Sequence, residues 1–163
     1  MFSSLLALSL LSSTASADWK GHSSYGITGT TSAETGGLEF NWAVAGSPFI
    51  KGPLLELNHS FGLAGAEMHR YGIGLRQELT PEIAVSGRGF VMPKTYGSHA
   101  RSTMTGLETV LSYTVVQNQG IGFGLHTYGA MASSHDETYW WAGAGLDLSF
   151  GGVYTNDKNR RES

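Results

Sequence analysis

Apolar and polar residues alternate along most of the chain, and the alternation is clearest near its C-terminal end. Every second residue from Trp140 to Phe150 is apolar, and the residues between them are small or polar apart from Trp141. A period of two is typical of a β-strand with one apolar face and one polar face. The stretch is about 11 residues long, which matches a tilted strand that crosses a bilayer.

Seven earlier segments alternate in the same way, so the sequence predicts eight strands. They cover residues 23–31, 38–46, 54–64, 68–79, 82–92, 104–115 and 121–131. Thr80-Pro81 and the run from Gln117 to Gly120 predict tight turns, whereas longer links follow the first, fifth and seventh segments. Short turns at one rim and long loops at the other are typical of an all-β, eight-stranded antiparallel up-and-down transmembrane β-barrel.

Alternation alone leaves open which face lies inside, because a soluble barrel of the lipocalin type turns its apolar row inward. Seven glycines share the row of the charged residues: Gly72, Gly74, Gly106, Gly122, Gly124, Gly143 and Gly145. On a water-facing wall these glycines would weaken the strands, but inside a narrow barrel they make room for long side chains. They favour a membrane barrel, and a soluble binder of an apolar ligand stays as an alternative.

The same polar row carries most of the charges on the predicted strands. We expect these groups to pair inside the barrel, because unpaired charges in a narrow interior are costly. The predicted lumenal polar network comprises Glu39, Glu56, Arg70, Arg76, Glu78, Arg88, Glu108, His126 and Asp147.

The N-terminal segment is typical of a secretory signal peptide. Phe2 to Leu11 is largely apolar, and Ala15-Ser16-Ala17 then offers a cleavage pattern of small residues. We therefore expect a signal peptide at residues 1–17, a β-barrel at 18–150 and a polar tail at 151–163. No other stretch has the roughly 18 apolar residues that a membrane-spanning helix requires.

Composition narrows the classes of function. The 163 residues suit one domain. A formal net charge of −3 with scattered basic residues gives no sign of a nucleic-acid partner. The chain has no cysteine, which excludes thiolate catalysis and cysteine metal ligands. His135-Asp136-Glu137 has a generic spacing in a predicted loop, so we expect neither a metal site nor a cofactor.

These features together resemble the small eight-stranded outer-membrane proteins of Gram-negative bacteria. Their closing strand is similar to the end of this chain, where the matching positions are Gly145, Leu148 and Phe150. The resemblance implies a place in the cell outer membrane, contact with membrane lipids and insertion by the barrel-assembly machinery, and it leaves the oligomeric state open. One departure is that the chain continues from Phe150 to Ser163.

A finer resemblance concerns the middle of the chain. The stretch from Gly72-Ile73-Gly74-Leu75 through Val91-Met92-Pro93-Lys94 is similar to YfaZ-type proteins. The function of that group is not established, so the resemblance adds no expectation about activity.

A lipid-modifying enzyme, an acyl hydrolase or acyltransferase, is the alternative of a different class. His59 is its candidate catalytic residue, because it falls on the apolar row, where a polar group facing lipid is costly. A nucleophile and its base must lie within hydrogen-bond reach, but the adjacent Ser60 points to the opposite face. The sequence favours a non-enzymatic barrel with a lumen filled by side chains, serving envelope structure, surface contact or small-solute passage.

Overall fold

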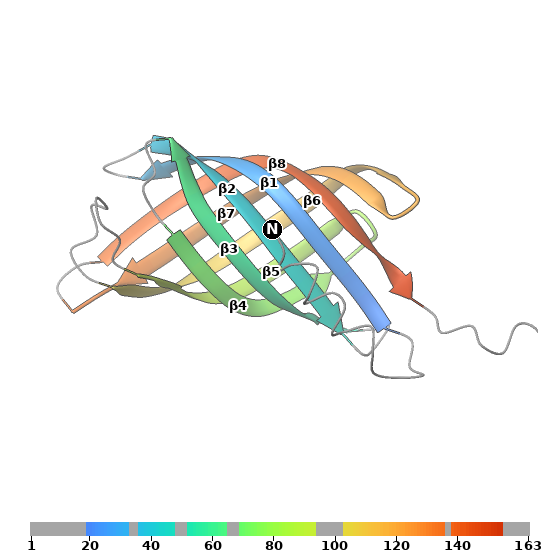
Figure 1. Cartoon of the computed structure of the whole chain (residues 1–163), viewed down its shortest axis with the longest axis horizontal. Coiled ribbons are helices and arrows are strands. Elements are labelled where there is room, and N and C mark those ends of the chain that lie inside the picture. Colours follow the sequence, from blue (N-terminus) through green and yellow to red (C-terminus); the bar gives the residue numbers. More distant parts are fainter. Residues whose placement is uncertain are drawn as a thin grey trace, which may run out of the picture.

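The computed structural model describes residues 19–32, 36–47, 52–64, 69–93, 103–135 and 138–154, and they form a closed barrel (Figure 1). Its eight strands are β1 (Trp19–Ser32), β2 (Gly36–Ser47), β3 (Leu54–Ala64), β4 (His69–Glu78), β5 (Ile83–Met92), β6 (Met104–Asn118), β7 (Ile121–Ser133) and β8 (Thr138–Tyr154). Each strand pairs antiparallel with the next, and β8 pairs with β1. The predicted eight-stranded up-and-down barrel is confirmed. No helix long and apolar enough to span a membrane occurs in the described part of the chain.

The closing strand is longer than the sequence predicts. β8 continues from Phe150 to Tyr154, and its last residues pair with the start of β1 as far as the pair Trp19 and Tyr154. The predicted boundary between barrel and tail, at Phe150, therefore lies four residues too early. The physical reason is that β1 begins at Trp19, earlier than predicted, and its backbone pairs with these last residues of β8. The predicted signal peptide (1–17) and the tail beyond residue 154 lie outside the described residues.

The stagger between strands sets which side chains meet inside. A row of paired residues that starts at Gly21 on β1 passes through Leu75 on β4 and Gly129 on β7, and it returns to β1 at Thr31. The row has then shifted by ten residues along β1. Such a stagger tilts the strands by about 35–45° in a closed barrel, as the sloping arrows of Figure 1 show.

The two faces of the barrel wall have opposite polarity, with the apolar face outward. Large apolar side chains on all eight strands are exposed, among them Leu38, Leu57, Ile73, Val91, Leu107, Leu125, Trp140 and Leu146. Thr28 and Glu56 on the other face are completely buried. A soluble barrel would show the reverse, since it buries its apolar row. The lipocalin-type alternative is therefore wrong, and the polar row faces the lumen as predicted.

Two short turns join strands at the rim where β1 begins and β8 ends. Gln119 and Gly120 connect β6 to β7 with positive φ angles of 48° and 82°, the combination that two-residue hairpin turns favour. In the turn from β4 to β5, the Thr80 hydroxyl accepts hydrogen bonds from the backbone N–H groups of Glu82 (3.2 Å) and Ile83 (3.0 Å). Both predicted tight turns are confirmed.

Inward-facing glycines allow large side chains to fill the lumen. A Cβ atom at Gly143 would lie 2.8 Å from Thr28 Cγ2, and one at Gly145 would lie 2.9 Å from His126 Cε1. Neither position can hold a larger residue unless a neighbour moves. These glycines therefore make room for the neighbouring side chains of the lumen, as predicted.

Candidate functional site

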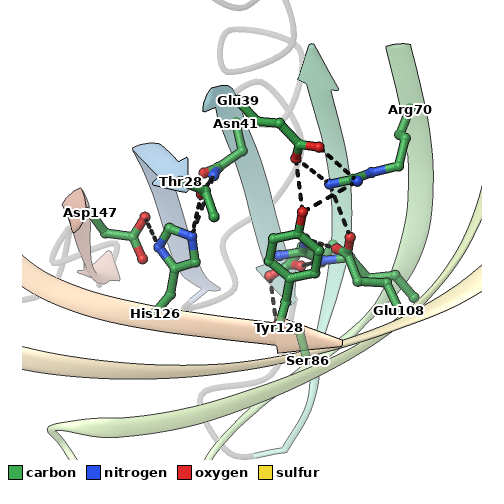
Figure 2. Close-up of polar contacts among 11 residues, drawn as sticks. Thr28, Glu39, Asn41, Arg70, Ser86, Glu108, His126, Tyr128 and Asp147 are labelled. Carbon is green, nitrogen blue, oxygen red and sulfur yellow. Dashed lines mark hydrogen bonds and ion pairs between the residues drawn. The ribbon is translucent and has the colours of Figure 1, made fainter. Parts of the chain in front are cut away.

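The centre of the lumen is organised around Arg70, on the inward face of β4. Its Nη2 donates to Glu39 Oε2 at 2.8 Å, and its Nη1 donates to Glu39 Oε1 at 3.2 Å. The same Nη2 lies 3.4 Å from Glu108 Oε2. The Tyr128 hydroxyl donates to Glu39 Oε2 at 3.0 Å. Figure 2 shows Arg70 held between β2, β6 and β7, the strands that carry these three partners.

A second arginine, Arg88, extends this network from Arg70 toward the rim with the short turns. Arg88 Nη1 donates to Glu108 Oε1 at 2.7 Å, and Arg88 Nε donates to Glu56. The Ser86 hydroxyl also donates a hydrogen bond to Glu56 Oε2, at 3.1 Å. Glu108 thus links both arginines, and one continuous network crosses the lumen from β2 to β7. This pairing offsets much of the cost of burying charged groups so deeply.

A separate cluster lies beside the first, around His126 on β7 (Figure 2). His126 Nε2 is 2.6 Å from Thr28 Oγ1, and Asn41 Nδ2 donates to the same hydroxyl at 2.6 Å. His126 Nδ1 lies 2.9 Å from Asp147 Oδ1, although the contact is poorly aligned for a hydrogen bond. The order hydroxyl, imidazole and carboxylate is that of an activated nucleophile. Thr28 is fully buried, however, so its hydroxyl has no open route to a substrate.

Apolar side chains fill the part of the lumen next to Arg70. The Arg70 guanidinium lies over the rings of Tyr128, Trp141 and Phe90, at 5.1, 5.2 and 5.9 Å from their centroids. These rings belong to a buried cluster that also contains Met92, Met104, Val110, Ala130 and Ala132. Such cation–π contacts stabilise a desolvated guanidinium. Ion pairs and packed rings together close the lumen at this level.

The rim with the short turns is less densely filled. Lys20 and Glu78 form an ion pair there, and a pocket of about 390 Å³ lies among residues of β1, β4, β5, β6 and β8. Arg76 lines this pocket and is 7% exposed, and its Nε has no hydrogen-bond partner. Arg76 forms no ion pair with any carboxylate in the described part of the chain.

The nine residues of the predicted network therefore divide into four groups. Glu39, Glu56, Arg70, Arg88 and Glu108 form one network; His126 and Asp147 form a second cluster; Glu78 pairs with Lys20; and Arg76 stands apart. Tyr128, which shares the inward face of β7 with His126, was also expected in the network, and it contacts Glu39 and Arg70. Four polar members were not predicted from the sequence: Lys20, Thr28, Asn41 and Ser86. Alternation could have found Asn41 and Ser86, which lie two residues from Glu39 and Arg88 on the same strands. Lys20 and Thr28 lie on β1, which carries no predicted member, so the spacing gave no signal for them.

His59 lies on the outer wall, away from every group in the lumen. Trp42 Nε1 donates to His59 Nδ1 at 3.2 Å, and His59 Nε2 is 3.4 Å from His69 Nδ1. The His59 ring also stacks on Tyr71, with 4.4 Å between centroids. Because an indole N–H can only donate, a neutral His59 carries its proton on Nε2, facing His69. The described contacts of His59 include no hydroxyl nucleophile.

No group of three or more His, Cys, Asp or Glu side chains in the described segments is arranged to hold a metal ion. The two histidines on the outer wall are close enough to share a ligand. The hydrogen bond from Trp42 to His59 Nδ1 leaves the proton of neutral His59 on Nε2, the nitrogen that faces His69. In this arrangement Nε2 has no lone pair to offer a metal ion.

Comparison with known proteins supports the fold. No protein-family model matches the chain, and no curated protein sequence matches it. Among solved structures, the Yersinia pestis outer membrane protein Ail, determined in a phospholipid bilayer nanodisc, is similar with a TM-score of 0.51 and 12% identity, over 80% of this chain and 99% of that chain. A de novo designed transmembrane β-barrel gives a TM-score of 0.46 and 9% identity, over 80% and 95% of the two chains.

The chain therefore has the fold of a transmembrane β-barrel of the outer-membrane kind. At 12% identity the likeness to Ail shows the fold alone. The resemblance to YfaZ-type proteins stays a prediction.

Proposed function

We propose that this protein is a non-enzymatic barrel of the bacterial outer membrane with a closed lumen, and that it serves envelope structure or surface contact. The observation that carries the proposal is an apolar outer wall around a lumen that buried ion pairs close. The wall presents apolar side chains outward, whereas Arg70 ties Glu39 and Glu108 together across the interior. A wall of this kind suits contact with acyl chains, because lipid-facing positions exclude unpaired polar groups.

The filled interior argues against passage of solutes. A conducting barrel needs a continuous polar path, as in wide porins, whereas eight strands leave an interior just wide enough for side chains. Here the ion-pair network and the ring cluster around Trp141 occupy successive levels of that interior. We therefore favour structure or surface contact over the third role predicted from the sequence, small-solute passage.

The proposed location also sets an orientation and a route of assembly. Outer-membrane barrels place their short turns in the periplasm and their longer loops outside. The turns at Gln119-Gly120 and at residues 79–82 would then face the periplasm, and surface contact would involve the links at the opposite rim. We also propose that the barrel-assembly machinery inserts the chain.

The proposed absence of catalysis rests on where the candidate groups lie. His59 contacts aromatic rings and His69, and Thr28 beside His126 is enclosed. Neither arrangement brings an accessible nucleophile and its base together at one surface, which acyl transfer would require.

Conductance measurements in planar lipid bilayers test the closed lumen. The refolded chain should show no discrete channel openings. The double variant Phe90→Ala/Trp141→Ala, which removes two rings of the buried cluster, should leak more than the native chain. Tyr71→Ala is the matched control, because it removes an exposed ring from the outer wall. Regular opening steps in the native protein would show that the lumen conducts. Cell fractionation and a gel-mobility shift on boiling test the membrane location separately.

A further inference from the structure

We propose that the pocket at the short-turn rim binds a small oxyanion, a phosphate or carboxylate group, with Arg76 as its anchor. The pocket has a volume of about 390 Å³ and lies between β1, β4, β5, β6 and β8, next to the turns at Thr80 and Gly120. In the orientation proposed above it would face the periplasm. The binding chemistry itself does not depend on that location.

Arg76 differs from the other two arginines of the lumen. Arg70 and Arg88 each contact two carboxylates, whereas Arg76 has no ion pair with a described residue. The buried Nε atoms of Arg70 and Arg76 both lack a hydrogen-bond partner, so the missing carboxylate is what sets Arg76 apart. Leaving a guanidinium buried without a partner is costly. A planar fork of N–H donors is the group that binds carboxylate and phosphate oxygens in pairs.

The carboxylates near Arg76 are already held by other groups. Glu56 accepts from Ser86 and Arg88, and Glu78 pairs with Lys20. On the other side, Asp147 lies against His126. These contacts fix the carboxylates in place, and the donors of Arg76 remain available to the pocket.

Other residues that line the pocket supply further donors for an oxyanion. Thr114 and Ser149 carry hydroxyl groups, Gln117 carries an amide, and His22 carries an imidazole. Glu82 also lines the pocket, but it accepts a hydrogen bond from the Thr80 hydroxyl at 3.0 Å. Since Glu78 and Glu82 also line the pocket and contribute negative charge, we expect weak binding.

Nuclear magnetic resonance of the arginine side chains tests this directly. The full chain, refolded in detergent micelles and labelled with ¹⁵N, is titrated with inorganic phosphate and, separately, with acetate. Sodium chloride at matched ionic strength is the reference. We expect a saturable shift of the Arg76 Nε–H resonance with both oxyanions and none with chloride, while the resonances of Arg70 and Arg88 stay in place.

Two variants complete the design. The Arg76 Nε–H resonance is assigned in the native chain by through-bond correlation with its own backbone amide, and Arg76→Gln should abolish the saturable shifts of neighbouring amides. Gln77→Ala changes the next residue of β4, which is exposed and does not line the pocket, and it should keep those shifts. An Arg76 resonance in the native chain that responds equally to chloride, or not at all, would overturn the proposal, as would unchanged binding in Arg76→Gln. Because the native chain gives the primary result, the test stands even if Arg76→Gln fails to fold. It is performed in micelles, so it can fail while the proposed membrane role holds.

Discussion

Replacing Arg70 by Met should destabilise the barrel more than any comparable change at its rim. The change keeps an unbranched side chain among the aromatic rings but removes the cation that Glu39 and Glu108 share. Both carboxylates are almost completely buried. Glu108 would keep Arg88, whereas Glu39 would keep only the hydrogen bond from Tyr128.

The magnitude follows from the burial of the pair. Breaking a buried ion pair by removing one partner costs about 3–5 kcal/mol, because the remaining charge is left uncompensated. Loss of the cation–π contacts with Tyr128 and Trp141 adds to this in the same direction. We therefore expect the free energy of unfolding to fall by about 3–5 kcal/mol in Arg70→Met.

Equilibrium unfolding by urea in lipid vesicles, followed by tryptophan fluorescence, measures this loss. Lys20→Met is the matched control: its ion pair with Glu78 is partly exposed, with 22% and 31% of the two side chains accessible, so it should lose less than about 1 kcal/mol. A double-mutant cycle with Glu39→Gln isolates the coupling between Arg70 and Glu39. If Arg70→Met is no more destabilising than Lys20→Met, the argument from burial is refuted.

Four further substitutions test the two faces of the wall. Gly143→Ala should destabilise the barrel, because the added Cβ would clash with Thr28 and Tyr128. Gly129→Ala should be tolerated, because its Cβ would point into open space, and urea unfolding compares the two variants. Thr28→Val should cost about 1–3 kcal/mol by leaving Asn41 and His126 without their shared partner, and similar stability to the native chain would contradict this. Cells that overproduce the native chain or His59→Ala should both contain unmodified lipid A, as measured by mass spectrometry. A modification of lipid A that appears with the native chain and is absent with His59→Ala would restore the enzyme alternative.

The sequence by itself determined the strands and the face on which each side chain lies. Alternation has a period of two, so once one residue of a strand is known to face inward, its neighbours follow as far as the next bulge. This is why Arg70, Glu108 and His126 could be placed in the lumen without coordinates. In β6 the register shifts between Thr114 and Val116, and both Val115 and Val116 are exposed. The glycine row favoured a membrane wall over a soluble one, and the exposed apolar face of the structure then excluded the soluble barrel.

Only the tertiary structure decided which of these side chains meet. Arg70 reaches Glu39 across 31 residues of sequence and Tyr128 across 58, because the ten-residue stagger of the closed barrel brings β2, β4 and β7 together at that level. The same stagger leaves Arg76 at a pocket without an ion pair among the described residues. Alternation carries no information on stagger, which depends on backbone pairing between every strand and its neighbours around the whole barrel.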